Sequence, residues 1–253
     1  MAQADFKDHF SGHANLYQKY RPAYSKAVAQ YCASLTPDRL CAWDAATGNG
    51  QLAVHLAEFF DEVVATDASS EQIERATPHA KVRYRIEPAE QSSLAAQSVS
   101  LITVAQAAHW FDAPRFEAEV RKVALPNAAI VYLAYDLFDD PEHPDFASVM
   151  RWFYTEVVGP YWPPERHYFD DGYRRVPFPF VEHEAPSLCL WASWTRDDAI
   201  GYVRSWSSTQ RYQKATGRDP IDLLVPRLCS VWPDPTSARK LAWQLFLRVG
   251  RVA

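Results

Sequence analysis

An acidic residue and two glycines lie within seven positions of one another, at Asp44, Gly48 and Gly50. An apolar run at residues 40–43 precedes them, and leucines at helical spacing follow. We therefore predict a tight turn that joins a buried strand to an amphipathic helix. Glycines in such a turn let the backbone approach a ligand, and the first N–H groups of the helix face that ligand.

The charge of Asp44 separates two ligands that use such a turn. Gly48-x-Gly50-x-x-Ala53 also fits the loose fingerprint of dinucleotide-binding proteins, in which an acidic residue such as Asp67 binds a ribose diol. A carboxylate beside the turn would repel the pyrophosphate of a dinucleotide, whereas it attracts the ammonium and sulfonium groups of S-adenosylmethionine. Asp44 therefore favours S-adenosylmethionine over NAD, and Asp67 is expected to bind ribose with either cofactor.

Three motifs along the chain carry a resemblance to a known family. The first is Asp44-x-Ala46-x-Gly48-x-Gly50, and the others are Tyr-Gln-Lys-Tyr-Arg-Pro-Ala-Tyr at 17–24 and Ala-His-Trp-Phe at 108–111. The chain resembles class I S-adenosylmethionine-dependent methyltransferases of type 11, similar to trans-aconitate methyltransferase, with Ala46 in place of the first motif glycine. The resemblance implies a Rossmann-like, doubly wound α/β sheet of seven strands, with the last strand antiparallel beside the sixth.

The hydrophobic pattern predicts alternating strands and helices. Strands are expected at residues 40–43, 63–66, 82–86, 99–104, 128–134, 188–194 and 241–249. Helices are expected at residues 14–35 with a break near 21, after the glycine turn, after Ser69 and Asp112, and near 144–158, 195–215 and 220–232. Strands that alternate with helices favour a parallel sheet, whose ligand crevice lies at the carboxyl ends of the strands.

Residues at these strand ends are expected to bind the cofactor. The resemblance implies that a segment with Tyr20 and Arg21 closes over it, and that an acidic-Ala-acidic loop contacts adenine. Pro88 replaces the first acid of that loop. The backbone N–H of Ala89 could still contact adenine, and the side chain of Glu90 is expected either to contact the cofactor or to be solvated. The expected cofactor-binding residues are Tyr20, Arg21, Asp44, Ala46, Gly48, Gly50, Gln51, Asp67, Ala68, Ala89, Glu90, Ala105 and Gln106.

His109 follows the fourth predicted strand, on the side of the sheet where the cofactor should lie. Methyl transfer is an in-line displacement, and alignment of the two reactants can supply about 7–11 kcal/mol. A carboxylate acceptor needs no base, whereas for a hydroxyl or amine acceptor His109 is the expected general base. Tyr17, Trp110 and Tyr135 are expected to contact the acceptor.

Prolines and aromatic residues cluster after Tyr135, around one predicted helix. We interpret this part as an insertion over the crevice rather than as a separate domain. Its aromatic residues should line the acceptor pocket, and its arginines could hold an anionic acceptor. The lining is expected to include some of Trp110, Tyr135, Trp152, Trp162, Trp191 and Trp206. The arginines are Arg166, Arg174, Arg175, Arg204 and Arg211, most of which are expected to be solvated at the surface.

Composition limits the class of protein. Hydrophobic residues make up 48% and charged residues 23% of the 253-residue chain, and no apolar run approaches the length of about 20 residues that spans a bilayer. Residues 1–13 lack the features of a signal peptide, so a cytoplasmic protein is expected. A formal charge of −5 argues against nucleic acid as a partner. The four separated cysteines suggest neither a metal site nor disulfides, and reduced core thiols are expected.

One domain over residues 1–253 is expected, with a cap helix at 1–35, a cofactor-binding half at 38–135 and a substrate-side lid with the last two strands at 136–253. The predicted activity is methyl transfer from S-adenosylmethionine to a small molecule, either a carboxylate or a hydroxyl compound. The alternatives are an NAD(P)-dependent oxidoreductase and a protein that binds S-adenosylmethionine without catalysis, which the changes at Ala46 and Pro88 allow.

Overall fold

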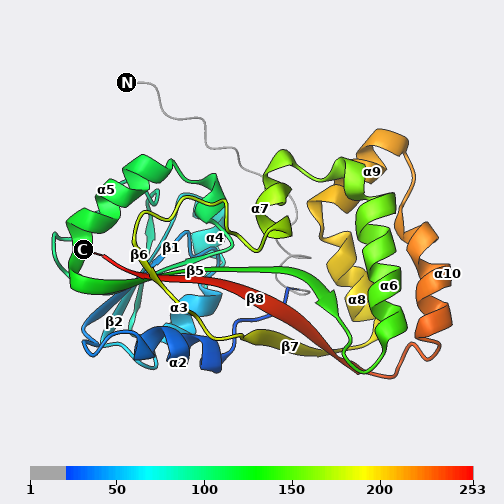
Figure 1. Ribbon diagram of the computed structural model, residues 1–253, viewed down its shortest axis with the longest axis horizontal. Helices are drawn as coiled ribbons and strands as arrows, with labels where there is room; N and C mark the ends of the chain where they lie inside the picture. Colours follow the sequence, from blue (N-terminus) through cyan, green and yellow to red (C-terminus); the bar gives the residue numbers. More distant parts are fainter. Residues whose placement is uncertain (1–20, 253) are drawn as a thin grey trace.

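A single mixed sheet runs through the molecule, in a computed structural model that describes residues 21–252 (Figure 1). Within this part of the chain the strand order is β3-β2-β1-β4-β5-β8-β6, and β7 also pairs with β8. The first five strands are parallel, whereas β8 is antiparallel to β5. The strands are β1 Cys41–Ala45, β2 Glu62–Asp67, β3 Val82–Ile86, β4 Val99–Ala105, β5 Ala124–Asp139, β6 Val181–His183, β7 Cys189–Trp194 and β8 Arg239–Arg251.

The helices form two groups. Helices α2 to α5 lie around the parallel strands, and α6, α8, α9 and α10 gather at the other end of the molecule (Figure 1). The α-helices are α2 Lys26–Ser34, α3 Gln51–Leu56, α4 Ser70–Glu74, α5 Ala113–Val123, α6 Pro144–Trp152, α7 His167–Asp170, α8 Arg196–Arg204, α9 Ser207–Thr216 and α10 Ile221–Val231. Short helical turns are η1 Ala108–Trp110, η2 Phe153–Val157, η3 Gly159–Tyr161 and η4 Pro164–Arg166.

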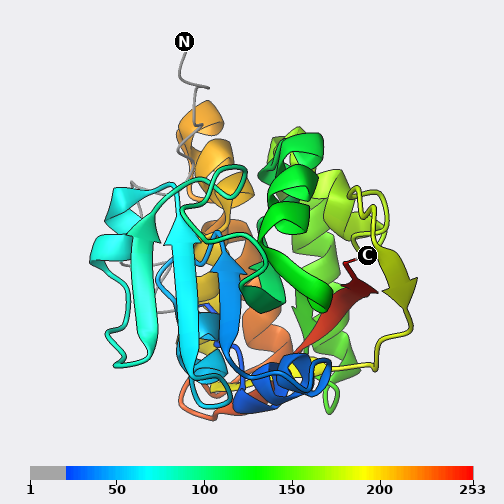
Figure 2. The ribbon, with the colours of Figure 1, turned by 90° about the vertical axis from the view of Figure 1, so that its left-hand side faces the viewer.

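The central strands are buried on both faces, as expected for parallel strands covered by helices. All residues of β4 except the last are buried, and four of the five residues of β1 are buried. The side chain of Asp112 caps α5 by accepting the N–H of Arg115, and a reciprocal capping box with Thr195 and Asp198 begins α8. Figure 2 shows the parallel strands side by side, with their arrowheads at one edge.

Strands β5 and β8 extend past the ends of β1 to β4, toward the helices α6, α8, α9 and α10 (Figure 1). Phe138 near the end of β5 stacks on Trp243 of β8, with ring centroids 5.3 Å apart. Both rings are fully buried, and Phe146 and Tyr202 from the lid helices pack against Phe138. The lid helices and the sheet therefore share one hydrophobic core.

The predicted parallel sheet and antiparallel last strand are confirmed, but the number of strands is wrong. Strand β6, which the sequence analysis did not predict, joins the edge of β8, so the described sheet has eight strands. It is three residues long and exposed, so it leaves no alternating hydrophobic pattern. Strands β6 and β7 pair in succession with the same side of β8.

Three predicted boundaries also need correction. Strand β5 spans Ala124–Asp139 rather than 128–134. Asn127, which was expected in the turn before this strand, lies inside it with a positive φ of 61°. The helix expected at 195–215 is two helices, α8 and α9, separated at residues 205–206. Residues 21–25 are not helical, in agreement with a break near 21, and the earlier part of that predicted helix lies outside the described residues.

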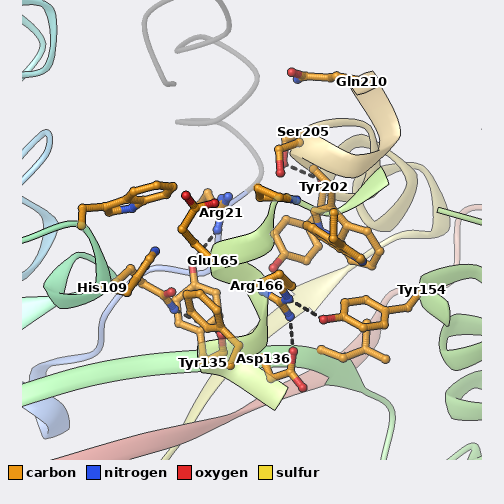
Figure 3. Close-up of a pocket in the computed structure, with 18 residues that line it drawn as sticks. Arg21, His109, Tyr135, Asp136, Tyr154, Glu165, Arg166, Tyr202, Ser205 and Gln210 are labelled. Atoms are coloured by element: carbon orange, nitrogen blue, oxygen red, sulfur yellow. Dashed lines mark hydrogen bonds and ion pairs between the residues drawn. The ribbon is translucent and has the colours of Figure 1, made fainter. Parts of the chain in front are cut away.

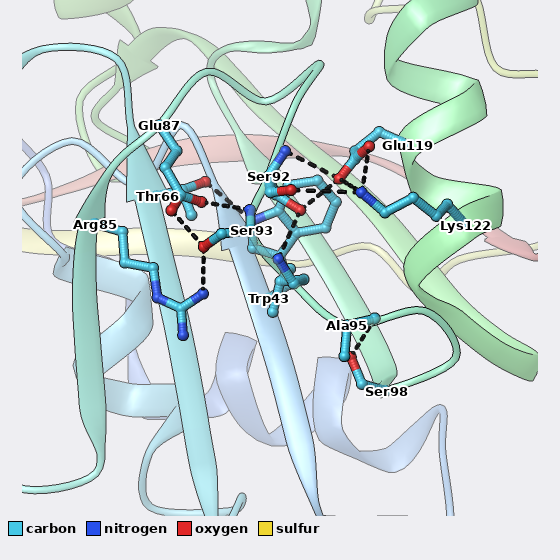
Figure 4. A network of polar contacts seen from close by, with 11 residues as sticks. Trp43, Thr66, Arg85, Glu87, Ser92, Ser93, Ala95, Ser98, Glu119 and Lys122 are labelled. Carbon is cyan, nitrogen blue, oxygen red and sulfur yellow. Dashed lines mark hydrogen bonds and ion pairs between the residues drawn. The ribbon is translucent and has the colours of Figure 1, made fainter.

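A polar network fixes the loop that follows β3 (Figure 4). The Glu119 carboxylate of α5 accepts both the N–H and the hydroxyl of Ser92, at 2.9 and 2.6 Å. Lys122 in turn donates to both oxygens of Glu119. Because Glu119 is buried, its full set of partners offsets the cost of burying a charge there. The network holds the loop that carries Ala89 and Glu90 against α5.

Two further expectations concern cysteines and membranes. All four cysteines are free thiols, but only Cys32 is buried, so the expectation of core thiols fails for Cys41, Cys189 and Cys229. In the part of the chain that is described, no helix is both long and apolar enough to cross a membrane.

Candidate active site

The glycine turn between β1 and α3 has a left-handed backbone at three positions. Ala46, Gly48 and Gly50 have φ angles of 53°, 58° and 83°. A Cβ on Gly50 would lie 2.2 Å from the hydroxyl of Tyr84, so this position requires glycine for space as well as for φ. Ala46 carries the strain that a glycine in the family motif avoids, which costs about 1–2 kcal/mol for a left-handed alanine.

Asp44 is a buried carboxylate near the end of β1, with 1% of its surface exposed. Its two oxygens accept the hydroxyls of Thr103 on β4, at 2.6 Å, and of Thr47 in the glycine turn, at 2.5 Å. Burial raises the pKa of Asp44 to about 6, and the hydrogen bonds from Thr103 and Thr47 oppose this effect. Asp44 therefore places a charge beneath the turn and fixes the position of Thr47.

Asp67 at the end of β2 links the glycine turn to α4. Its carboxylate accepts the backbone N–H of Gly48 at 2.8 Å and that of Ser69, the N-cap of α4, also at 2.8 Å. The sequence analysis predicted Asp67 as a ribose ligand and did not foresee this link. These bonds orient the carboxylate at the carboxyl edge of the sheet.

The structure places the other predicted cofactor residues along the same edge. The pairing of Ala45 with Thr66 and with Val104 aligns the ends of β1, β2 and β4. The carboxylate of Glu90 accepts the N–H of Asp112 at 3.0 Å, so it also contacts the start of α5. Ala68, Ala105 and Gln106 lie at or next to the ends of β2 and β4, whereas Gln51 begins α3 and Ala89 lies in the loop after β3. Tyr17 and Tyr20 lie outside the described residues.

A pocket lies between this edge of the sheet and the lid helices (Figure 3). Gln106 and His109 contribute from the segment after β4, and Tyr135 contributes from β5. The backbone of Gln106 has a positive φ of 60°, and its side chain donates to the carbonyl of Tyr135 at 3.3 Å. The remaining lining residues are Arg21, Trp110, Asp136, Leu137, Tyr154, Trp162, Pro163, Glu165, Arg166, Phe169, Tyr202, Ser205, Trp206, Ser207 and Gln210.

Arg166 is the cation at the centre of the lid side of this pocket. Its guanidinium lies over the rings of Tyr154, Trp162 and Phe169, at 5.0, 4.7 and 4.6 Å from their centroids. It also forms an ion pair with Asp136 of β5 and donates to the Tyr154 hydroxyl, as the dashed lines in Figure 3 show. Burial raises the pKa of Asp136, and the charge of Arg166 opposes this effect.

His109 packs against the floor of the pocket, between aromatic rings. Its ring centroid is 4.7 Å from that of Trp110 and 4.9 Å from that of Phe169. Its Nδ1 lies 2.7 Å from the hydroxyl of the fully buried Tyr173. Burial, together with the nearby charges of Arg166 and His167, lowers the pKa of His109 to about 3.

The structure shows which of the residues expected around the acceptor line this pocket. They are Trp110, Tyr135, Trp162, Trp206 and Arg166. Trp191 is instead 48% exposed on β7, where Lys240 covers it, and Trp152 packs under Arg227. These two rings belong to the same part of the chain, but they lie on other faces of the elements that carry them. The remaining predicted arginines, Arg174, Arg175, Arg204 and Arg211, do not line the pocket.

Tyr173 is one of the residues around this site that could not be predicted from the sequence. It lies more than sixty positions after His109, in a segment without a periodic pattern. Asp136, Tyr154 and Tyr202 were missed for a similar reason, because strand β5 was predicted to end before Asp136 and no pattern indicates which lid face points inward. The aromatic and proline enrichment of the lid was the available signal.

The order of the sheet, the turn after its first strand and the carboxylates at its edge define a Rossmann-like ligand-binding fold. The model of a family described as a methyltransferase domain matches residues 43–132. A candidate methyltransferase of Dictyostelium discoideum is 33% identical over 238 residues, which are 93% of this chain and 90% of that protein.

Solved structures show the same relationship. The structure of a candidate type II methyltransferase from Anaeromyxobacter dehalogenans is 38% identical, with a TM-score of 0.87 over 92% of this chain and 98% of the other. That of a candidate methyltransferase from an antibiotic biosynthesis pathway of Anabaena variabilis shares the fold, with 14% identity and a TM-score of 0.53 over 93% of this chain and 100% of the other.

The chain belongs to the class I S-adenosylmethionine-dependent methyltransferases with this methyltransferase domain. It is therefore an enzyme, and its cofactor is S-adenosylmethionine rather than NAD. The two relatives more than 30% identical are named only as methyltransferases, so similarity to trans-aconitate methyltransferase stays a prediction.

The residues at the sheet edge fit this cofactor. Among residues 21–252, a Cβ on Gly48 would meet only the Gln72 side chain, at 3.7 Å, which leaves room for a ligand to approach this backbone closely. The carboxylates of Asp44 and Asp67 suit an ammonium group and a ribose diol, respectively. Over residues 21–252, a search for three or more clustered His, Cys, Asp or Glu side chains that could hold a metal found none.

Proposed function

We propose that this methyltransferase acts on a small molecule that binds between the carboxyl edge of the sheet and the lid, and that carries a carboxylate or hydroxyl oxygen. The observation that supports the proposal is the pocket itself, which lies beside Gln106 and His109 at the end of β4 and is walled by aromatic rings of the lid. A concave, largely aromatic pocket with a few polar groups is typical of small-molecule sites.

The lining offers hydrogen-bond donors to an acceptor oxygen. Trp162 lines the pocket, and its indole N–H is buried without a hydrogen-bond partner in the described part of the chain. Arg166 is fixed by Asp136 and by three rings, so its guanidinium is held in place at little further cost in side-chain entropy. We favour a carboxylate acceptor, because a guanidinium and an indole N–H donate and do not accept.

The bound S-adenosylmethionine would supply an activated methyl group on a cationic sulfur. We propose that Asp44 acts through its charge and by holding Thr47, because its own oxygens are already engaged by Thr47 and Thr103. Asp67 fixes the turn by accepting the N–H of Gly48, and we propose that it lies beside the ribose of the bound cofactor. The aromatic lining excludes water and orients the acceptor, which is the main demand of an in-line displacement.

We also propose that the acceptor is not a nucleic acid and that the protein works in the cytoplasm. The formal charge of −5 opposes phosphate binding. The four free thiols are typical of a reducing compartment.

A methyl-transfer screen tests the proposal. Purified protein is incubated with methyl-labelled S-adenosylmethionine and a panel of small carboxylic acids, each paired with its amide and its primary alcohol. We expect label transfer to at least one acid and not to its amide. Transfer only to amides, or to none of the compounds, would contradict the proposed acceptor class.

The role of Arg166 is tested with a matched pair of variants. Arg166→Met should raise the KM for the acid at least tenfold, while the thermal midpoint of the variant shows whether it is folded. Arg175→Met is the control, since Arg175 pairs with Asp171 and does not line the pocket. Equal KM values for the wild type and the folded Arg166→Met variant would remove this residue from acceptor binding.

A further inference from the structure

We infer that Tyr173 fixes His109 in the tautomer that carries its proton on Nε2, so that His109 offers the acceptor pocket a hydrogen-bond donor and no lone pair. The catalytic meaning of this inference rests on the proposed function, whereas the tautomer itself follows from the contacts between Tyr173 and His109.

Tyr173 is held beneath His109 by a strained turn. The chain leaves α7 through Gly172 and Tyr173, which both adopt a left-handed backbone with φ angles of 68° and 70°. Their N–H groups bond back to the carbonyls of Phe169 and Tyr168, at 3.0 and 2.8 Å. A left-handed aromatic residue is an outlier that costs about 1–3 kcal/mol, and such strain concentrates at functional sites.

The hydroxyl oxygen of Tyr173 already accepts a hydrogen bond from the backbone, since the N–H of His109 donates to it at 3.3 Å. A phenol oxygen can accept hydrogen bonds and has one proton to donate. Tyr173 is fully buried, so the proton of its hydroxyl also needs an acceptor within the protein.

The remaining partner of this hydroxyl is Nδ1 of His109, at 2.7 Å. Burial raises the pKa of Tyr173, so the hydroxyl keeps its proton. Within residues 21–252, Nδ1 is the acceptor that the structure provides for that proton. Nδ1 therefore accepts, and the proton of a neutral imidazole must then lie on Nε2.

The surroundings of His109 keep the ring neutral. Four aromatic rings, Trp110, Tyr168, Phe169 and Tyr173, lie within 6.2 Å of the His109 ring, centroid to centroid. The charged residues that line the same pocket are Arg21, Asp136, Glu165 and Arg166, of which Asp136 and Arg166 form an ion pair. Burial among the rings disfavours a charged imidazole, and the positive charge of Arg166 adds to this effect.

The consequence is a different role from that expected of a strand-end histidine. A general base needs a lone pair directed at the proton that it removes. His109 presents an N–H instead, which binds and orients an acceptor oxygen that is already able to attack. Tyr173 is then a positioning residue that acts through His109.

Nitrogen NMR of protein labelled with 15N-histidine tests the inference directly. Long-range proton–nitrogen spectra at pH 7 distinguish a protonated from an unprotonated ring nitrogen, and His109→Gln identifies the His109 signals among those of eight histidines. We expect Nε2 to be protonated and Nδ1 to be a bare acceptor. A protonated Nδ1, or a charged ring, would overturn the inference.

A pair of tyrosine variants tests the role of Tyr173. Tyr173→Phe should abolish the single tautomer, whereas Tyr168→Phe should leave it unchanged, because the Tyr168 ring packs 6.2 Å from that of His109 without a hydrogen bond to it. An unchanged tautomer in folded Tyr173→Phe would overturn the role of Tyr173. If this variant does not fold, the wild-type spectrum still decides the tautomer.

These spectra need neither cofactor nor acceptor. A wrong tautomer would thus overturn the inference while leaving methyl transfer to a small molecule intact. A failed acceptor screen would overturn the proposed function while leaving the tautomer of His109 as measured.

Discussion

At the scale of single residues, Asp44 is kept as a carboxylate in a place that disfavours charge. It is almost completely buried, and two threonine hydroxyls are its hydrogen-bond partners. Groups with such strongly shifted pKa values are concentrated at functional sites. We propose that the charge of Asp44, which burial makes costly, attracts the cationic cofactor.

We expect Asp44→Asn to change the pH dependence of stability. The pKa of Asp44 is raised to about 6 in the folded protein, so the folded state binds this proton more tightly than the unfolded chain does. The wild-type free energy of unfolding should therefore fall as the pH rises from about 4 to about 6, by about 3 kcal/mol from this group. The asparagine variant has no carboxyl at this position and would lack that loss.

Urea unfolding of both proteins at pH 4, 5, 6 and 7 measures this difference. The free energy of unfolding of the asparagine variant, relative to that of the wild type, should increase as the pH rises from about 4 to about 6. Above about pH 6 this difference should stay constant. A difference that does not change with pH would mean that the Asp44 carboxyl titrates normally.

His109 provides a second prediction at the residue scale. Glutamine keeps an N–H donor but is not a base, so His109→Gln should retain transfer activity within about tenfold of the wild type if the histidine acts as a donor. His109→Phe, which keeps a ring without nitrogen, should lose about 1–3 kcal/mol of transition-state binding, or roughly 5- to 150-fold in kcat/KM.

Initial rates with the acceptor found in the screen provide the comparison. Equal, large losses in both His109 variants would point to proton abstraction instead of donation. The sequence placed His109 correctly beside the sheet edge. It could not show the role, because that depends on Tyr173, whose position only the turn after α7 determines.

At the scale of elements, the glycine turn is set by its neighbours as much as by its own residues. Gly50 and Gly217 have similar left-handed backbones, with φ angles of 83° and 71°, but within the described part of the chain only Gly50 has a neighbour where a Cβ would lie. Gly50→Ala should therefore destabilise the fold by about 2–4 kcal/mol, and Gly217→Ala by about 1 kcal/mol.

Denaturant unfolding of the two variants isolates the packing term, since the backbone cost is shared. Similar losses would show that Tyr84 moves aside without cost and that the space beside Gly50 is not restrictive.

The pattern of elements explains which parts of the fold could be predicted. Strands buried on both faces, such as β4, leave an apolar run that is easy to recognise. The exposed β6 leaves none, and the left-handed Asn127 resembles a turn although it lies inside β5. The acceptor pocket was predicted by region only, because which face of a lid helix points inward depends on tertiary packing.

At the scale of the whole molecule, we propose that the cofactor half and the lid form one domain. Strands β5 and β8 run through both parts, and Phe138 and Trp243 join them in a shared core. Urea unfolding should accordingly give one cooperative transition, with coincident midpoints by far-UV circular dichroism and by tryptophan fluorescence.

Tryptophans in both parts make this comparison informative, since Trp43 lies in β1 whereas Trp206 and Trp232 lie among the lid helices. Two separated transitions would indicate a lid that unfolds independently and would refute the single domain.

The central claim is that the turn beneath which Asp44 lies binds S-adenosylmethionine, and calorimetric titration tests it most directly. S-adenosylmethionine, S-adenosylhomocysteine and NAD are titrated into the wild type and into Asp44→Asn at pH 7.5. We expect micromolar binding of the first two ligands, no binding of NAD, and at least tenfold weaker binding of S-adenosylmethionine to the variant, which is about 1.4 kcal/mol. Binding of NAD alone, or equal affinity of the two proteins for S-adenosylmethionine, would contradict the account.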